Sequence, residues 1–475
     1  MRHFDLLIDG KRIATEETRE VTNPYSGEVV GTVAVATAEH SEAAVDAAAA
    51  ALRRGAPPQH ERAAVLDRAR AIVADRAEDF AISIAQEAGK PITTARAEVA
   101  RCQDTLLFAA VEARKLAGHM IPFEASAQGE GKLGFTVHHP KGVVAAISPF
   151  NFPLNLVCHK LAPAFAAGCP VVLKPAGETP LTAYLLAEAL VEAGVPDGFV
   201  NVISGSSSEL GPAMTGRPEV AVISFTGSTE VGHSLAQANP TKTVLLELGN
   251  NTPVIVDASA DLGQAAARIA ATGFSYAGQS CISVQRILVH AQVKDDFLDA
   301  LLAKVGELVT GDPLDEATAV GPMIRSADRD RVKSWIEEAV QAGATLRAGG
   351  EVNDDGTLQP TVLDDVRPDM KVSRQEVFGP VLAVQTVSSL DEAVDLANDT
   401  TYGLQAGIFT GDLAAALVAA QRLVFGGVTI NESPTFRSDQ QPYGGVRDSG
   451  NTREGPAYAI HDYLEETAII VSLPA

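Results

Sequence analysis

Short apolar runs alternate with amphipathic segments through the centre of the chain. Between residues 142 and 257 the runs are GVVAAIS, VVLK, FVNVIS, AVISF, TVLLEL and PVIVD, and segments such as 182–193 separate several of them. A second region of this kind covers residues 262–409, with ILVH and VLAVQTV as expected strands and 294–309 and 329–342 as expected helices. This alternation is typical of right-handed βαβ units, whose parallel sheet is covered by helices on both faces. The pattern predicts an α/β fold with two domains.

The two ends of the chain have a different pattern. Residues 4–33 alternate apolar and polar positions around turn signals, which predicts short antiparallel strands, whereas residues 41–118 have a helical pattern. The last alternating run, ETAIIVSL, predicts a strand that has no partner nearby in the sequence. Together with the strand-like residues 129–139, it predicts either an arm that pairs with a neighbouring subunit or a local hairpin of the same subunit.

Composition and charge exclude several classes of protein. The chain has 475 residues, of which 46% are hydrophobic and 20% charged, an ordinary globular balance in a chain long enough for two domains. It has 37 basic and 60 acidic residues, so its net charge is −23, which disfavours binding to nucleic acid or to an anionic membrane surface. No apolar run of about 20 residues is present, and the first residues lack the apolar core of a signal peptide. We therefore expect a cytoplasmic protein.

The chain has four cysteines, which are Cys102, Cys158, Cys169 and Cys281. Their spacing fits neither a zinc site nor a disulfide framework, so we expect free thiols and no metal site. A lone cysteine in an apolar context is usually an inert buried thiol. Cys281 differs because the tripeptide GQS precedes it, between a helical pattern and a strand. A loop with glycine lets the sulfur face a cavity, so Cys281 is a candidate nucleophile, with an inert thiol as the alternative.

Two polar residues stand beside predicted strands. Glu247 follows the apolar run TVLL, where desolvation would raise its pKa toward that of a general base; the alternative is a carboxylate that caps the next turn. Asn151 lies between a strand and a helix, with Pro149 and Pro153 beside it. Its amide could donate to an oxygen that gains negative charge, and the alternative is a helix N-cap.

The stretch AVISFTGSTEVG predicts a strand, a turn and a helix. Gly227 lies in this turn, at a helix N-terminus where free N–H groups and the helix dipole favour anions. The spacing is not that of the Gly-x-Gly-x-x-Gly fingerprint, so this motif alone is weak. Lys174, which ends the run VVLK, could reach a ribose hydroxyl or a phosphate at the carboxyl edge of the sheet.

In combination, these motifs resemble those of the aldehyde dehydrogenase superfamily. The resemblance covers nearly all of the chain, from NPYSGEVV through SPFNFP, KPAGETP, FTGSTEVG, LELGN, GQSC, EVFGPV and YGL to PYGGV, SG and REG. It implies a Rossmann-like NAD(P)-binding domain of residues 1–123 and 140–248 and an α/β catalytic domain of residues 249–440. It further implies a small β oligomerisation arm of residues 124–139 and 441–475, in a homodimer or homotetramer.

The resemblance also implies a reaction. The family oxidises an aldehyde to its carboxylic acid with NAD or NADP, through a thiohemiacetal and a thioester on a cysteine that matches Cys281. Asn151 matches the donor to the oxyanion, and Glu247 matches the base that activates water. The implied cofactor-binding positions are Ser148, Pro149, Phe150, Lys174, Ala176, Gly177, Phe225, Thr226, Gly227, Ser228, Val231, Leu248, Gly249, Glu376 and Phe378.

One cofactor position departs from the common family pattern. Gly177 stands where many NAD-preferring relatives have a glutamate that accepts hydrogen bonds from the ribose and would repel a 2′-phosphate. We therefore expect NADP to be tolerated or preferred, unless Glu178, one position further on, takes the place of that glutamate.

The stretch INESPTFRSDQQPYGGV resembles a subgroup that includes lactaldehyde dehydrogenases and oxidisers of small phosphonate or sulfonate semialdehydes. A short aldehyde with an anionic tail, such as phosphonoformaldehyde or phosphonoacetaldehyde, needs cations near the sulfur. The candidates are Arg101, His159 and Arg437, and the alternative for both arginines is pairing with acids of this acidic chain. Two rival functions are a CoA-acylating semialdehyde dehydrogenase, which Glu247 disfavours, and a non-catalytic relative that only binds cofactor.

Overall fold

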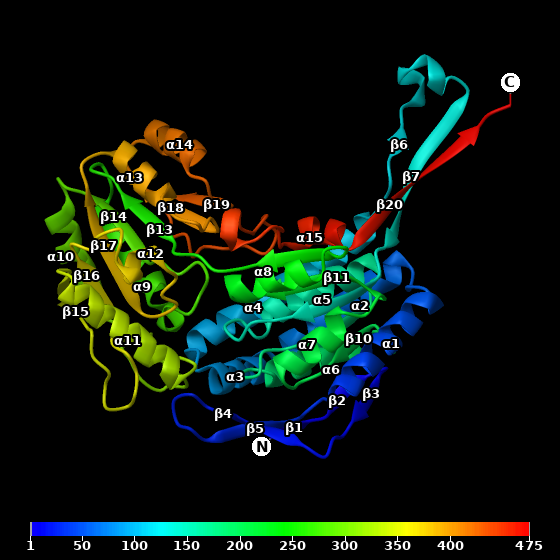
Figure 1. Cartoon of the computed structure of the whole chain (residues 1–475), viewed down its shortest axis with the longest axis horizontal. Helices are drawn as coiled ribbons and strands as arrows, with labels where there is room; N and C mark the ends of the chain where they lie inside the picture. Colours follow the sequence, from blue (N-terminus) through cyan, green and yellow to red (C-terminus); the bar gives the residue numbers. More distant parts are fainter. Residues whose placement is uncertain (1, 475) are drawn as a thin grey trace.

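The computed structural model describes residues 2–474, which form two α/β lobes and a projecting arm (Figure 1). Each lobe is built on a seven-stranded sheet, with the strand orders β12-β11-β8-β9-β10-β2-β3 and β15-β16-β17-β14-β13-β18-β19. Neighbouring strands are parallel except at one edge of each sheet, where β2, β3 and β15 pair antiparallel. The predicted α/β architecture is confirmed.

The first sheet consists of β2 (Leu6–Ile8), β3 (Lys11–Ile13), β8 (Val143–Ile147), β9 (Val171–Lys174), β10 (Val200–Val202), β11 (Val220–Thr226) and β12 (Thr243–Glu247). The helices of this lobe are α1 (Ala38–Arg54), α2 (Gln59–Asp75), α3 (Ala77–Ala88), α4 (Ile92–Lys115), α5 (Asn155–Ala167), α6 (Leu181–Glu192), α7 (Ser207–Thr215) and α8 (Thr229–Ala238). Successive residues of β8 alternate between two buried clusters, one with α2–α6 and one with α1 and α7, because side chains of a strand point to opposite faces. Burial on both faces explains why the strands appear in the sequence as continuous apolar runs.

The second sheet consists of β13 (Pro253–Val256), β14 (Arg286–His290), β15 (Thr345–Ala348), β16 (Thr361–Asp364), β17 (Val381–Val387), β18 (Gln405–Phe409) and β19 (Gly427–Ile430). The helices around it are α9 (Leu262–Gly273), α10 (Lys294–Val305), α11 (Ser326–Gln341), α12 (Lys371–Arg374), α13 (Leu390–Asn398) and α14 (Leu413–Arg422). The run PVIVD, which continues the pattern of the first region, is β13 and lies between β14 and β18 of this second sheet.

A separate three-stranded sheet near the N-terminus contains β1 (Arg2–Phe4), β4 (Thr18–Thr22) and β5 (Val29–Ala34). The expectation of antiparallel strands is correct for β4 and β5 but wrong for β1, which pairs parallel with β5. Parallel pairing is possible because β2, β3 and β4 lie between them in the sequence and return the chain to the start of β1.

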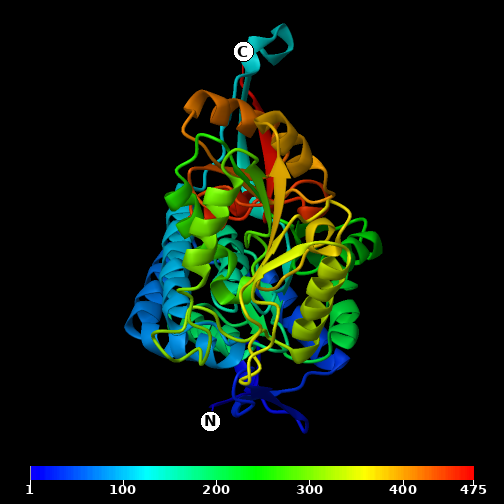
Figure 2. The ribbon, with the colours of Figure 1, turned by 90° about the vertical axis from the view of Figure 1, so that its left-hand side faces the viewer.

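The arm is formed by β6 (Met120–Ile121), β7 (Lys132–Pro140) and β20 (Leu464–Ser472), and it stands away from both lobes (Figures 1 and 2). β7 and β20 pair antiparallel from Leu464 opposite Pro140 to Ser472 opposite Lys132. The run ETAIIVSL therefore has its partner within the same chain. Residues 441–463 precede this sheet and pack on the body, where α15 (Pro456–Asp462) contacts α4 and α5. Among the helices of residues 2–474, none has the length and apolar character needed to cross a membrane.

Candidate active site

A cavity of about 740 Å³ lies where loops of the two lobes meet. Its lining includes loops that follow the carboxyl ends of β8, β9, β11 and β12, which is where ligands bind in open α/β sheets. Every cofactor-binding position expected from the sequence, from Ser148 to Phe378, lines this cavity. Asn151, Glu247 and Cys281 line it as well. The structure thus brings together three candidates for chemistry that lie far apart in the sequence.

The loop that carries Cys281 begins with a strained turn. Tyr276, Ala277 and Gly278 follow one another with φ of 50°, 52° and 69°, which is costly for the first two residues because of their Cβ atoms. The hydroxyl of Tyr276 donates a 2.7 Å hydrogen bond to the carbonyl of Ala88 at the end of α3 and helps to hold this conformation. This turn includes the glycine of GQS and leads directly into Cys281, which lies at the cavity wall.

Cys281 is half-buried, whereas the other three cysteines are buried, and all four are free thiols. Its Sγ lies 2.9 Å from the hydroxyl oxygen of Tyr443, in the PYGGV stretch. Burial raises the pKa of the Cys281 thiol to about 12, and the hydrogen bond with Tyr443 opposes this rise. The protein's own groups therefore keep the sulfur protonated at neutral pH, and a cation bound beside it would favour the thiolate.

Asn151 lies between β8 and α5 and faces the Cys281 loop. Its Nδ2 donates a 3.0 Å hydrogen bond to the carbonyl of Gln279, while its Oδ1 is buried with no partner in residues 2–474. The N-cap of α5 is Leu154, so Asn151 does not serve as the helix cap. The second N–H of its amide remains available to a ligand next to Cys281.

Glu247 is the last residue of β12, and its side chain is buried beside the same loop. Neither carboxyl oxygen has a hydrogen-bond partner within the described chain, so it does not cap the following turn. Burial, and then the nearby charge of Glu454, raise its pKa well above the ordinary value. A Cβ at Gly444, the first glycine of PYGGV, would lie 2.0 Å from the backbone oxygen of Thr452 and 2.7 Å from Glu247 Oε1, so both the backbone and this carboxyl require glycine here. A buried carboxyl of this kind can exchange a proton with water.

The cavity wall also contains polar groups that have one protein partner or none among residues 2–474. Within the described part of the chain the buried Ser148 hydroxyl has no hydrogen bond, and the buried Lys174 ammonium has a single 3.3 Å bond to the carbonyl of Pro175. Glu376 accepts a 3.0 Å hydrogen bond from the backbone of Asn250, and burial raises its pKa to about 7. Such groups fit a ligand rich in hydroxyl and phosphate groups, as a dinucleotide is.

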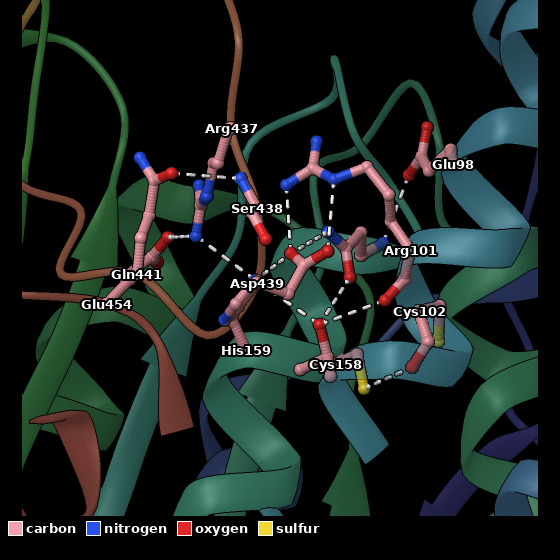
Figure 3. Close-up of polar contacts among 12 residues, drawn as sticks. Glu98, Arg101, Cys102, Cys158, His159, Arg437, Ser438, Asp439, Gln441 and Glu454 are labelled. Atoms are coloured by element: carbon pink, nitrogen blue, oxygen red, sulfur yellow. Dashed lines mark hydrogen bonds and ion pairs between the residues drawn. The ribbon is translucent and has the colours of Figure 1, made fainter. Parts of the chain in front are cut away.

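Asp439 is at the centre of a network of charged residues from distant parts of the chain (Figure 3). Arg101 on α4 makes a two-pronged ion pair with Asp439, with distances of 2.9 and 3.2 Å. His159 Nε2 lies 2.9 Å from the same carboxylate. Arg437 pairs with Glu454 at 2.8 Å, and its guanidinium carbon lies 3.7 Å from the centre of the Tyr443 ring. Both arginines therefore pair with acids, as the alternative interpretation expected.

A second cavity of about 50 Å³ adjoins the sulfur, and its lining includes Arg101, Arg437, Tyr443, Glu247 and Cys281. Two of the three cations expected near the sulfur thus face one small space beside it. His159 does not line this cavity, because its ring is buried behind Asp439, where burial lowers its pKa.

Sequence reasoning did not single out Tyr443, Asp439 or Glu454. Tyr443 and Glu454 lie in the quoted PYGGV and REG motifs, but nothing local marks either side chain as a neighbour of Cys281 or Glu247. Arg437 and Asp439 are two positions apart, a spacing that places side chains on the same side of an extended segment. This spacing was the one available signal for Asp439.

Replacing Tyr443 with phenylalanine is expected to raise the apparent pKa for alkylation of Cys281 by about 1, because the sulfur anion loses a hydrogen-bond donor. The measurement is the pH dependence of the rate of labelling by iodoacetamide, with the labelled peptide identified by mass spectrometry. Tyr458→Phe is a matched control, since Tyr458 is exposed and lies on α15. An unchanged profile in Tyr443→Phe would show that the hydroxyl does not stabilise the thiolate.

Comparison with known proteins gives concordant results. A family model described as "Aldehyde dehydrogenase family" matches residues 12–469. The 3-sulfolactaldehyde dehydrogenase of Priestia megaterium is 44% identical over 473 residues, which cover 100% of this chain and 99% of that protein. An aldehyde dehydrogenase from Physcomitrella patens, solved with the reaction product succinate, superposes with a TM-score of 0.95 at 38% identity, covering 99% and 98% of the two chains. An NADP-dependent glyceraldehyde-3-phosphate dehydrogenase from Bacillus halodurans, solved with NADP, has a TM-score of 0.96 at 33% identity, covering 99% and 100%.

Proposed function

The chain belongs to the aldehyde dehydrogenase family, and from this premise we propose that it oxidises a short, anion-bearing aldehyde to its acid with NAD⁺ or NADP⁺. The observation that carries the proposal is the position of Cys281 and Glu247, which line both the larger cavity and the small arginine-lined cavity. A nucleotide in the first and an aldehyde tail in the second would meet at the sulfur.

We assign the larger cavity to the dinucleotide. Glu376 would hold the nicotinamide ribose, Lys174 the adenosine ribose, and residues 225–228, at the start of α8, the diphosphate. The rings of Phe150 and Phe378, edge to face at 5.9 Å, would border the cofactor. When bound, the nicotinamide supplies the hydride acceptor that converts a thiohemiacetal on Cys281 to a thioester.

The side chains around the sulfur would perform the remaining steps. Cys281 first loses its thiol proton to water, and Sγ then adds as the thiolate to the aldehyde carbon. The carbonyl oxygen becomes an oxyanion that accepts hydrogen bonds from the Asn151 amide and the Cys281 backbone N–H. Glu247 then takes a proton from a water molecule, whose oxygen attacks the thioester carbon and displaces the sulfur of Cys281. Burial raises the pKa of Glu454, but the charges of Arg437, His159 and Lys160 together lower it below the ordinary value, so a negative charge stands near Glu247.

Glu247 also bears on the rival functions. A relative that passes the acyl group to CoA needs no base for water, and a non-catalytic relative needs neither the base nor the thiol. The buried carboxyl of Glu247, kept free of protein partners, is costly unless it is used, which favours hydrolysis.

The substrate class follows from the small cavity. Its volume admits only a few atoms beyond the aldehyde carbon, and two guanidinium groups in its wall suit a sulfonate, phosphonate or carboxylate. The named activity of the Priestia megaterium relative and the succinate in the Physcomitrella patens structure point to the same kind of substrate. The unbranched or hydroxylated three-carbon aldehydes with such a tail are the first candidates.

Arg437→Gln and Arg101→Gln are each expected to lower kcat/KM for an anionic aldehyde by about 10- to 100-fold, because a charge-assisted hydrogen bond to the tail is lost. For propanal, which has no anion to bind, the loss is expected to be less than about fivefold for Arg101→Gln. Initial rates with sulfolactaldehyde, succinate semialdehyde, phosphonoacetaldehyde, lactaldehyde and propanal provide the comparison.

Arg114→Gln is the matched control for Arg101→Gln, since Arg114 is on the same helix and pairs with Asp67 at the surface. Arg437→Gln removes both a positive charge beside the substrate and the ion-pair partner of Glu454. Arg437→Lys keeps the positive charge, so this variant is expected to recover part of the preference for anionic aldehydes over propanal. If both glutamine variants lost activity on propanal as much as on the anionic aldehydes, the arginines would not be substrate anchors.

We also propose that the arm joins copies of this chain into a homodimer or homotetramer. The outer part of β20 exposes Ile469, Ile470 and Val471, with Ile470 59% exposed. An apolar strand that projects from the body is costly in water and is typical of a contact surface.

A further inference from the structure

We propose that Arg19, together with Lys174, forms a phosphate-binding subsite at the adenosine end of the larger cavity, and that its ligand is the 2′-phosphate of NADP⁺. The inference rests on the proposed function for the identity of the nucleotide. It concerns a residue of the N-terminal sheet that no motif of the sequence marks.

The geometry centres on Gly177, which lines the larger cavity. Arg19 lies on β4, and its side chain reaches across to this glycine. A Cβ at Gly177 would lie 2.5 and 2.7 Å from the two terminal nitrogens of Arg19 and 3.0 Å from its guanidinium carbon. The guanidinium thus fills the space that a larger residue at 177 would need, including the glutamate of many NAD-preferring relatives.

Arg19 has no close ion-pair partner within residues 2–474, and the carboxylate of Glu178 acts on it only from beyond ion-pair distance. Within residues 2–474 the Arg19 side chain makes neither a hydrogen bond nor an ion pair, although the chain has 60 acidic residues against 37 basic ones. Glu178, the acid next to Gly177, is paired with Arg325 instead. Among residues 2–474 the Lys174 ammonium has only a carbonyl partner, and burial followed by the charge of Arg19 lowers its pKa. Two cations without a carboxylate of their own mark a place for an anion.

The position of this pair selects a phosphate on the ribose. A cavity of about 200 Å³, lined by Arg19, shares Gly177 and Glu178 with the larger cavity, so Arg19 stands at the border between the two. A phosphate monoester carries a charge of about −1.5 to −2 at pH 7 and offers three acceptor oxygens. A guanidinium binds two of these oxygens at once, and an ammonium can bind the third. NAD⁺ has only a hydroxyl there, so it gains nothing from the charge of Arg19.

The test is a titration of the full chain and of Arg19→Gln by calorimetry with NADP⁺, NAD⁺, adenosine 2′,5′-bisphosphate, AMP and inorganic phosphate. We expect Arg19→Gln to weaken NADP⁺ and adenosine 2′,5′-bisphosphate by about 10- to 100-fold, and NAD⁺ and AMP by less than about threefold. The difference in NADP⁺ affinity between the unaltered chain and Arg19→Gln should become smaller as salt is added, because salt screens an interaction between charges near solvent. Arg2→Gln is the matched control, since Arg2 is an exposed arginine of the same sheet.

Equal weakening of all four nucleotides, or no change in any, would overturn the proposal. Binding of inorganic phosphate that depends on Arg19, without any preference for the 2′-phosphorylated nucleotides, would overturn the assignment of the ligand. The titrations need neither aldehyde nor turnover, so they stand apart from the proposed reaction. A chain that oxidised no aldehyde but bound adenosine 2′,5′-bisphosphate through Arg19 would refute the proposed function and support the subsite.

Discussion

Replacing Cys281 with serine is expected to lower kcat for aldehyde oxidation by about 10³- to 10⁶-fold, the range seen when an enzyme loses its nucleophile. A serine hydroxyl ionises far less readily than a thiol, and the oxygen ester it would form is a poorer partner for water than a thioester. The loss should appear in the rate of cofactor reduction at saturating aldehyde. Binding of NAD⁺ or NADP⁺ should change little, because the nucleotide would rest mainly on residues of the first lobe.

Cys169→Ser is the matched control for this experiment. The Cys169 thiol is buried and lies 3.1 Å from the carbonyl of Tyr463, where a serine hydroxyl can also donate. This variant should keep most of the activity. Turnover that survived in Cys281→Ser, or an alkylating reagent that abolished activity while labelling another cysteine, would contradict the role given to Cys281.

Replacing Glu247 with glutamine is expected to lower steady-state turnover by about 10²- to 10⁴-fold while leaving the first turnover largely intact. The amide cannot take a proton from water, so the thioester on Cys281 should accumulate. Rapid mixing should then show one equivalent of reduced cofactor formed quickly, and the mass of the protein should rise by that of the acyl group.

The pH profile gives a second measurement on the same residue. Burial raises the pKa of Glu247, and a general base works only when it is deprotonated. Turnover of the unaltered protein should therefore fall as the pH drops through that raised pKa, and Glu247→Gln should lack this limb. Rapid turnover in Glu247→Gln, or acyl-CoA as the main product when CoA is supplied, would favour the CoA-acylating alternative.

The fold could be predicted where burial leaves a local pattern. β8, β11 and β13 are buried on both faces, so each appears in the sequence as an apolar run between helical segments. These runs were sufficient to predict the α/β fold class. The parallel pairing of β1 with β5 could not be predicted, because β1 has only three residues, two of them exposed, and so carries almost no burial pattern.

Site residues that lie in a recognisable motif could be predicted from the sequence. Contacts between charged residues that are far apart in the sequence could not. Cys281 was found from the tripeptide before it, but the left-handed conformation of Tyr276 and Ala277 was not, since neither residue type favours it. Arg101 and Arg437 were found as cations, whereas Asp439, which organises the cluster, is one acid among many in a polar loop. His159 was named as a substrate cation because it follows shortly after Asn151 in the sequence, which does not show that its ring is buried.

The arm has a consequence for how the chain is made. Lys132 and Ser472, which face each other at one end of the β7–β20 ladder, are 340 positions apart. During synthesis on the ribosome, β7 cannot pair with β20 until residues 464–472 have been made. Until then its only neighbouring strand among the described residues is the two-residue β6. An unpaired strand edge is a template for other strands, so nascent chains are most exposed to misassembly during that interval. A variant that lacks β20 would keep the edge of β7 unpaired after folding.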